Sequence, residues 1–338
     1  MTSQPPLTPG STTLAASLSR RQWLGAAVAA AASPGAWSQP LFAAKPITII
    51  VPYTAGGASD IGARMLSVEL GKALGQPVLI DNVGGAGGAV GVQKLLRAAP
   101  DGYTLLYGSL SECVLVPLIN PTVGYKTDDL SAIVFAGATP AAFVTRPDFP
   151  ASNMEEWIAY ARKNPGKLSY GSPGVGTLQH LIAETVKVKT STFMLHIPYR
   201  GGGNIMTDVV AGQIDIGVTT APNVVGLATQ GRIKVLGVTS AARLPILPNV
   251  ASFSETPSLK GMDLQTWGML FGPRGVPEPV QQKINAAVNA ILMQPAMVEQ
   301  RRKLGSTLAA VLTPAQAQAF LLKQREIYGP AASRIKPE

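Results

Sequence analysis

Short apolar runs alternate with longer helical patterns along most of the chain. The run at 47–51 is broken by Pro52, and a glycine-rich turn then leads into a helical pattern over 61–74, for which Ser59 is a suitable N-cap residue. The same order returns with a strand at 78–80, a helix over 90–98 and a strand at 103–107. Continuous apolar strands separated by helices are typical of a parallel sheet that is covered on both faces.

The pattern restarts in the second half of the chain. The expected elements are a helix at 157–163, a strand at 168–170, a helix at 177–186, a strand end at 196–199, a helix at 204–211, strands at 214–218 and 233–239, and helices at 280–292 and 315–328. We therefore predict an α/β protein of two domains, each a mostly parallel sheet flanked by helices. The last helices are expected to return to the first domain. The predicted domains are 39–143 plus 265–338, and 144–264, with a ligand cleft between them.

The first 38 residues are typical of an export signal. Arg20 and Arg21 precede an apolar run over 24–32, and Ala36-Trp37-Ser38, with a small residue at each end, is a plausible cleavage site. The run is far shorter than the roughly 20 residues that span a bilayer. The paired arginines match the twin-arginine export motif, and an ordinary Sec signal is the alternative. The mature protein is therefore expected in the periplasm.

Composition narrows the function classes. The chain has 338 residues, a formal net charge of +9, one cysteine and two histidines. A single cysteine excludes an internal disulfide framework and Cys₄ or Cys₂His₂ zinc sites. The basic residues are scattered, and the densest cluster, at 301–303, is interpreted as solvated surface, which argues against nucleic-acid binding. We expect no metal and no cofactor.

Three glycine-rich loops are the candidate ligand site. They lie at 54–59, 84–88 and 172–176, and each joins a strand end to a helix start. In a parallel sheet, such helix N-termini aim unpaired N–H groups at anionic ligands. The alternative is that these glycines only form tight turns. No dinucleotide fingerprint is present, because Val90 stands where its third glycine is needed, and no P-loop or Gly-x-Ser-x-Gly elbow occurs.

The two histidines do not form a catalytic group. His180 lies one helical turn beyond Thr177 and is expected to pack under the loop, and His196 is expected to be structural. Asp60, Asp208 and Asp215 lie on different elements and form no evident carboxylate pair. The sequence therefore does not predict an enzyme.

Several motifs follow one another in an order that resembles a known family. Residues 51–60 read VPYTAGGASD and hold the pattern P-[FY]-x-x-G-G-x-x-D. Further motifs are VGGAGG at 83–88, PDGYTLL at 100–106, GSPGVGT at 171–177, HIPYRG at 196–201 and GQID at 212–215. This ordered set resembles the substrate-binding proteins of tripartite tricarboxylate transporters, also called the Bug family, over about residues 45–335.

The resemblance implies a two-domain periplasmic-binding-protein (Venus flytrap) fold that closes on a small carboxylate. Tyr53 would flank the ligand and Asp60 would hold the first loop, although a helix N-terminal charge is an equal role for Asp60. Arg200 is a candidate partner for a second carboxylate, with a solvated surface arginine as the favoured interpretation. The residues at ligand-holding positions are Tyr53, Thr54, Ala55, Gly56, Gly57, Asp60, Gly85, Gly87, Ser109, Ser172, Gly174, Gly176, Thr177, Tyr199, Arg200 and Thr219.

The chain departs from the family pattern at three places. Thr219 and Thr220 replace an acidic residue followed by asparagine, so a partner for a ligand ammonium is missing and dicarboxylates or aromatic acids are favoured over amino acids. Ala55 replaces a proline, which loosens the first loop. The segment 110–113 reads LSEC instead of a Thr-His-type sequence, which puts ligand contacts from it in doubt.

The resemblance implies a monomeric periplasmic receptor that captures a dicarboxylate, a tricarboxylate or an aromatic acid. It would deliver this ligand to the membrane permease subunits of a tripartite transporter. The alternatives are a ligand receptor for a two-component sensor, an exported enzyme on the same scaffold, and a structural surface protein.

Overall fold

The computed structural model describes residues 42, 44–307 and 310–332. The predicted export signal, 1–38, lies outside the described residues. The strands are β1 (Ile47–Val51), β2 (Val78–Asn82), β3 (Thr104–Ser109), β4 (Leu130–Thr145), β5 (Leu168–Ser172), β6 (Met194–Pro198), β7 (Ile216–Thr220), β8 (Lys234–Val238) and β9 (Gln265–Pro273). The helices are α2 (Ala58–Leu74), α3 (Ala89–Leu96), α4 (Val116–Ile119), α5 (Met154–Lys163), α6 (Leu178–Thr190), α7 (Gly202–Val210), α8 (Ala221–Thr229), α9 (Glu278–Leu292), α10 (Pro295–Lys303) and α11 (Pro314–Ala332).

The predicted parallel pairs are present in both halves of the fold. Strand β1 pairs in parallel with β2 and β3, and β5 pairs in parallel with β6 and β7. Ile47, Ile49 and Ile50 of β1 are fully buried, as expected of a strand covered on both faces. The expectation of an α/β protein is confirmed.

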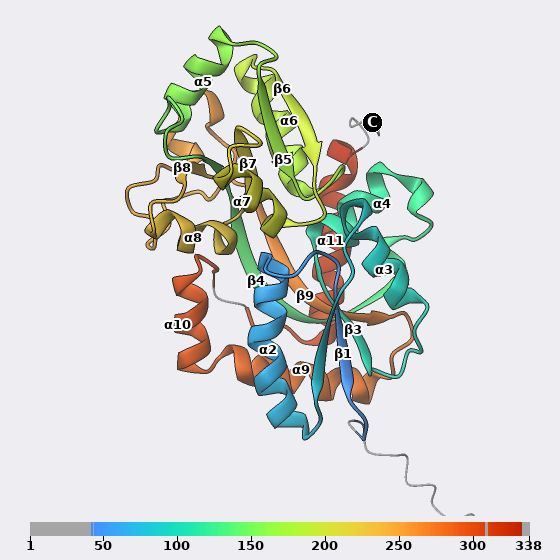
Figure 1. Cartoon of the computed structure of the whole chain (residues 1–338). Helices are drawn as coiled ribbons and strands as arrows, with labels where there is room; N and C mark the ends of the chain where they lie inside the picture. Colours follow the sequence, from blue (N-terminus) through green and yellow to red (C-terminus); the bar gives the residue numbers. More distant parts are fainter. Residues whose placement is uncertain (1–41, 43, 308–309, 333–338) are drawn as a thin grey trace, which may run out of the picture. The chain divides into compact units, whose positions relative to one another are not determined.

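Two strands that the pattern did not predict join the halves. Strand β4 pairs antiparallel with β7 and β8 in one sheet and with β9 in the other, and β9 pairs antiparallel with β3. The order is β2-β1-β3-β9-β4-β7-β5-β6, with β8 also on β4. Figure 1 shows β4 and β9 running side by side through the middle of the fold. These strands make both sheets mixed, and the predicted domain boundaries stay a prediction.

The final helices return to the first part of the fold, as predicted. Helix α9 packs against α2 and β4, and α11 packs on β4 beside the π-helical segment Ser111–Leu115. None of the helices among the described residues combines the length and apolar character needed to cross a bilayer.

The expected N-cap of the first helix is wrong. Helix α2 begins at Ala58, its N-cap is Gly57, and no side chain caps it there. Asp60 explains the difference, because its carboxylate accepts a hydrogen bond from the amide of Gly56 at 2.9 Å. A carboxylate inside the first turn thus holds the preceding loop, so Ser59 is not required as a cap.

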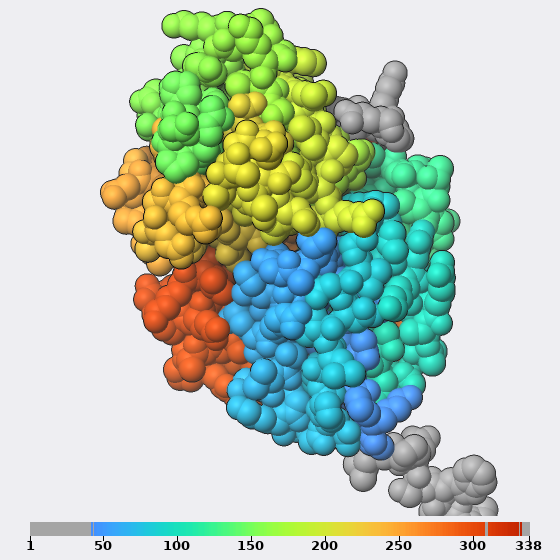
Figure 2. Space-filling view, viewed as in Figure 1, coloured from blue at the N-terminus to red at the C-terminus, as the bar shows by residue number. Residues whose placement is uncertain are grey.

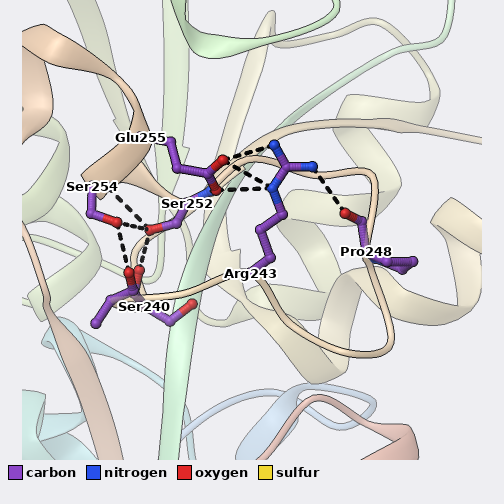
Figure 3. A network of polar contacts seen from close by, with 7 residues as sticks. Ser240, Arg243, Pro248, Ser252, Ser254 and Glu255 are labelled. Atoms are coloured by element: carbon purple, nitrogen blue, oxygen red, sulfur yellow. Dashed lines mark hydrogen bonds and ion pairs between the residues drawn. The ribbon is translucent and has the colours of Figure 1, made fainter.

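The long loop between β8 and β9 is held by a side-chain network beside an isolated parallel bridge between Val238 and Ser252. Figure 3 shows Arg243 donating from Nη2 to Glu255 at 2.7 Å and from Nη1 to the carbonyl of Pro248 at 3.0 Å. Ser252 donates to the carbonyl of Ser240 in the same network. The hydrogen bond from Arg243 is the main reason that the pKa of Glu255 is lowered to about 2.

Candidate functional site

A cavity lies where both halves meet the strands β4 and β9. The volume open to the centres of water molecules is about 100 Å³, against roughly 10–15 Å³ for a single water. It therefore has room for a small organic molecule. Its described lining includes one charged side chain, Arg301, and no carboxylate. Polar lining side chains include Tyr53, Ser59, Ser109, Thr219, Asn223 and Thr266.

Four helices begin at this cavity. Residues from the first turns of α2, α6, α7 and α8 line it: Ala58, Gln179, Gly202 and Pro222. Each helix N-terminus has unpaired N–H groups and a partial positive charge. Together with Arg301, they place positive charge around the cavity. The described lining holds no carboxylate, and the carboxylates of Asp60 and Glu112 lie behind it. The arrangement suits an anionic ligand.

A buried carboxyl group supports the first loop from behind. The Tyr53 hydroxyl donates to Glu112 at 2.7 Å, and the Ser109 hydroxyl donates to the same carboxylate at 2.6 Å. The amide of Ser109 also donates to Glu112. Burial raises the pKa of Glu112 to about 7, despite these donors. Because Tyr53 and Ser109 line the cavity, Glu112 positions two lining side chains without lining it itself.

Asp60 holds the glycine loop to the sheet. Its carboxylate accepts hydrogen bonds from the Gly56 amide and Arg64 Nε, both at 2.9 Å, and from Asn82 Nδ2 at 3.0 Å. Burial alone would raise the pKa of Asp60, but these hydrogen bonds and the charge of Arg64 lower it. The side chain is buried, so its contacts are protected from water. The geometry therefore supports the loop-holding role and also places a negative charge in the first helical turn.

We expect Asp60→Ala to lower the free energy of unfolding by about 1–3 kcal/mol, because buried donors lose their acceptor. Chemical denaturation at pH 7 measures this change. The pKa of Asp60 is lowered in the folded protein, so its contribution is present above the ordinary carboxyl pKa near 4 and is lost as pH falls through the folded value. The difference between wild type and variant should therefore shrink in acid.

Asp148→Ala is the matched control, since Asp148 is an exposed partner of Arg146, and it should change stability by less than about 0.5 kcal/mol. Equal effects of the two variants would contradict the role of Asp60.

Two stacked histidines lie under the glycine loop at 172–176. The amide of Gly176 donates to His180 Nδ1 at 3.3 Å, and the His180 and His196 rings stack at 4.3 Å. His196 Nε2 lies 2.7 Å from the Ser172 hydroxyl, and Ser172 is fully buried. Burial, followed by the charge of His180, lowers the pKa of His196 to about 4, so the ring is neutral near pH 7. The predicted packing of His180 under the loop is confirmed.

The glycine loops of the two halves touch each other. The Thr54 amide donates to the carbonyl of Arg200 at 3.2 Å, and the Thr54 hydroxyl donates to Asn204 at 2.8 Å. A Cβ atom on Gly174 would lie 2.9 Å from the Cα atom of Gly87. On the face drawn in Figure 2, the blue and cyan segments lie directly against the yellow ones. The two halves are therefore closed over the cavity.

The predicted site residues fall into two groups. Tyr53, Gly57, Ser109 and Thr219 line the cavity. The others do not line it and form the loops around it: Thr54, Ala55, Gly56, Asp60, Gly85, Gly87, Ser172, Gly174, Gly176, Thr177, Tyr199 and Arg200. The Arg200 side chain is exposed, and the Tyr199 hydroxyl donates to Asp208 at 2.6 Å. Ligand contacts by all of these residues stay a prediction.

Sequence reasoning missed several lining residues. Asn223, Thr266 and Arg301 carry no motif, and Arg301 was interpreted as part of a solvated basic cluster. Its neighbours Arg302 and Lys303 are exposed, so the interpretation is correct for them and wrong for Arg301. The segment 110–113 supplies Ser111 to the lining, and Glu112 behind it.

Comparison with known proteins decides the family. The sequence model of the family described as tripartite tricarboxylate transporter family receptor matches residues 62–325. The chain belongs to this receptor family. Among relatives, the UPF0065 protein in the tcbD-tcbE intergenic region of Pseudomonas sp. (strain P51) is 33% identical over 308 residues, covering 90% of this chain and 91% of that protein.

Several solved structures share the fold. The periplasmic binding protein BugD has a TM-score of 0.82 at 30% identity, covering 87% of this chain and 99% of that one. MatC from Rhodopseudomonas palustris with bound malate has a TM-score of 0.80 at 26% identity, covering 86% and 99%. A second R. palustris protein, with adipate, has a TM-score of 0.82 at 26% identity, covering 86% and 97%. The resemblance stated from the motifs and the expected periplasmic-binding-protein fold are confirmed.

Proposed function

We propose that this protein is a periplasmic receptor for a small organic carboxylate, which it delivers to the permease subunits of a tripartite tricarboxylate transporter. The observation that carries the proposal is the cavity itself. Its described lining has four helix N-termini and one arginine, and no carboxylate. Two receptors of the same fold hold malate and adipate, which are dicarboxylates, and this supports the ligand class.

The closed loops explain how the ligand would be held and released. The contacts between Thr54 and the 200–204 segment exist only when the two halves meet. A ligand that binds the closed state better than the open state shifts the population toward closure. The permease subunits would then recognise the closed form. The same closure could report the ligand to a sensor, and loss of carboxylate uptake after deletion of the gene distinguishes transport from sensing.

Thermal unfolding of the protein, freed of co-purified ligand, tests the proposal. The panel contains mono-, di- and tricarboxylates and aromatic acids. A ligand at 100 times its Kd stabilises the folded state by about 2.7 kcal/mol, which corresponds to a Tm increase of roughly 5 °C at this size. We expect at least one carboxylate to produce this shift and to be recovered unchanged. No shift with any acid, together with turnover of an ester or amide, would overturn the receptor proposal in favour of an exported enzyme.

A further inference from the structure

Arg301 is placed differently from its two basic neighbours. Arg302 donates to Glu299 at 2.8 Å on the exposed surface of α10, and Lys303 is exposed. Arg301, in the last turn of the same helix, lines the cavity instead. No described carboxylate forms an ion pair with it. A cation in a partly enclosed cavity without a carboxylate partner is costly unless an anion joins it.

The two central strands make room for this guanidinium. Gly137 of β4 has a φ of +113°, and a Cβ atom there would collide with Arg301 Nη2. Gly137 pairs with Gly268 of β9, where a Cβ atom would lie 2.8 Å from the Tyr107 hydroxyl oxygen. Side chains at either glycine would thus fill the space that Arg301 and Tyr107 occupy. The backbone at the junction of the two sheets is shaped around a positively charged group.

The lining of the cavity contains buried polar atoms without hydrogen-bond partners. Among the described residues that line it, these are Arg301 Nε, Thr266 Oγ1 and Asn223 Oδ1. The only hydrogen bond from the Arg301 side chain within the described residues runs from Nη2 to the carbonyl of Thr307 at 3.3 Å. Nε–H is therefore available, and a carboxylate can pair with Nε–H and an Nη–H together. A buried donor without a partner carries a free-energy penalty, and a ligand oxygen that accepts a hydrogen bond from it removes this penalty.

We propose that Arg301 binds a second, distal carboxylate of the ligand and makes the receptor selective for dicarboxylates over matched monocarboxylates. The first carboxylate then binds at the helix N-termini near Tyr53 and Ser109. This assignment rests on the proposed function and adds the specificity-determining residue. Arg200, which the sequence suggested for a second carboxylate, has an exposed side chain outside the cavity lining.

Matched acid pairs test the assignment by calorimetry. The probes are adipate with hexanoate, succinate with butanoate, and phthalate with benzoate, because each pair differs in its second carboxylate. We expect wild-type protein to bind at least one diacid more than 10-fold tighter than its partner. Arg301→Gln should lower the affinity for that diacid by at least 10-fold and change the affinity for the monoacid by less than 3-fold. Arg301→Lys, which keeps the charge but not the fork of donors, should give an intermediate loss.

Arg302→Gln is the control, because Arg302 lies on the same helix turn but pairs with Glu299 on the surface; its affinities should equal those of wild type. If diacids bind and both Arg301 variants match wild type, the assignment of Arg301 is wrong while the proposed function stands. The assignment also fails if wild type binds both acids of every pair equally. If no acid binds wild type, the proposed function fails, and this assignment with it. Should Arg301→Gln not fold, Arg301→Lys decides, and an unchanged diacid affinity overturns the assignment.

Discussion

Gly174→Val is expected to weaken carboxylate binding by at least 100-fold while the protein stays folded. A Cβ atom at this position would lie 2.9 Å from Gly87 Cα and 3.0 Å from Gly87 N, which belong to the opposite loop. Backbone atoms cannot move aside as the end of a side chain can, and φ at Gly174 is +134°, a conformation that valine rarely adopts. The two loops therefore cannot close. Calorimetry measures the affinity, and small-angle X-ray scattering measures whether ligand makes the variant more compact.

The control for this variant is Gly231→Val. Gly231 also has a positive φ, of +68°, but a Cβ atom there meets nothing within 4 Å. It should cost some stability from backbone strain and leave ligand affinity unchanged. A Gly174 variant that becomes as compact as wild type on adding ligand would contradict the closure argument.

The second large effect is expected at Glu112. Replacement by alanine removes the acceptor of the Ser109 hydroxyl and the Ser109 amide, and leaves the Tyr53 hydroxyl only the carbonyl of Gly87 at 3.2 Å. Leaving buried donors without a partner costs about 1–3 kcal/mol each, so we expect Glu112→Ala to lower the free energy of unfolding by roughly 3–5 kcal/mol. Denaturant titration measures it. Because Tyr53 and Ser109 line the cavity, ligand affinity should fall as well.

The same residue predicts how stability depends on pH. The pKa of Glu112 is raised from 4.5 to about 7 in the folded protein, with burial as the main cause. The folded state therefore binds more protons than the unfolded chain between these values. The contribution of Glu112 to stability is largest below pH 4.5 and is lost as pH rises through 7, by roughly 3 kcal/mol in total. Glu112→Gln should remove this loss. The same pH dependence in Glu112→Gln as in wild type would contradict it, and Glu69→Gln, at an exposed ion pair with Lys72, is the control.

The local order of apolar residues and glycines along the chain is sufficient to predict the parallel strands. Strand β1 is a short apolar run, and both β1 and β5 end in a glycine loop that leads into a helix, which is the feature that predicts them. Strand β4 was not, because Gly137 and Pro140 interrupt its apolar pattern and its partners in β9 lie more than 120 residues away. Its stability comes from pairing on both sides, which no local window contains.

The residues of the site also fall into those that local sequence predicts and those that it does not. The glycine loops could be predicted because close backbone approach requires glycine in a recognisable order. Arg301, Thr266 and Asn223 could not, because each reaches the cavity through the packing of an element whose position depends on the whole fold. A basic triplet at the end of a helix resembles an ordinary solvated surface, and the folded structure is needed to see that Arg301 packs against Gly137 while Arg302 pairs with Glu299.

The pairing of Gly137 with Gly268 has a consequence for the order in which ligand contacts form. Strand β4 pairs with β9 in one sheet and continues into the other, where it pairs with β7 and β8, so we expect a rotation of one half against the other to have its axis along this strand, near the glycine pair. Points close to an axis move least. We therefore expect the floor of the cavity, formed by Arg301, Tyr107 and Thr266, to keep its geometry in the open protein, and the glycine loops at the rim to move furthest. An arriving anion would meet a preformed floor first and receive its remaining contacts from the rim, so the floor determines which ligands are accepted and the rim determines how long they stay.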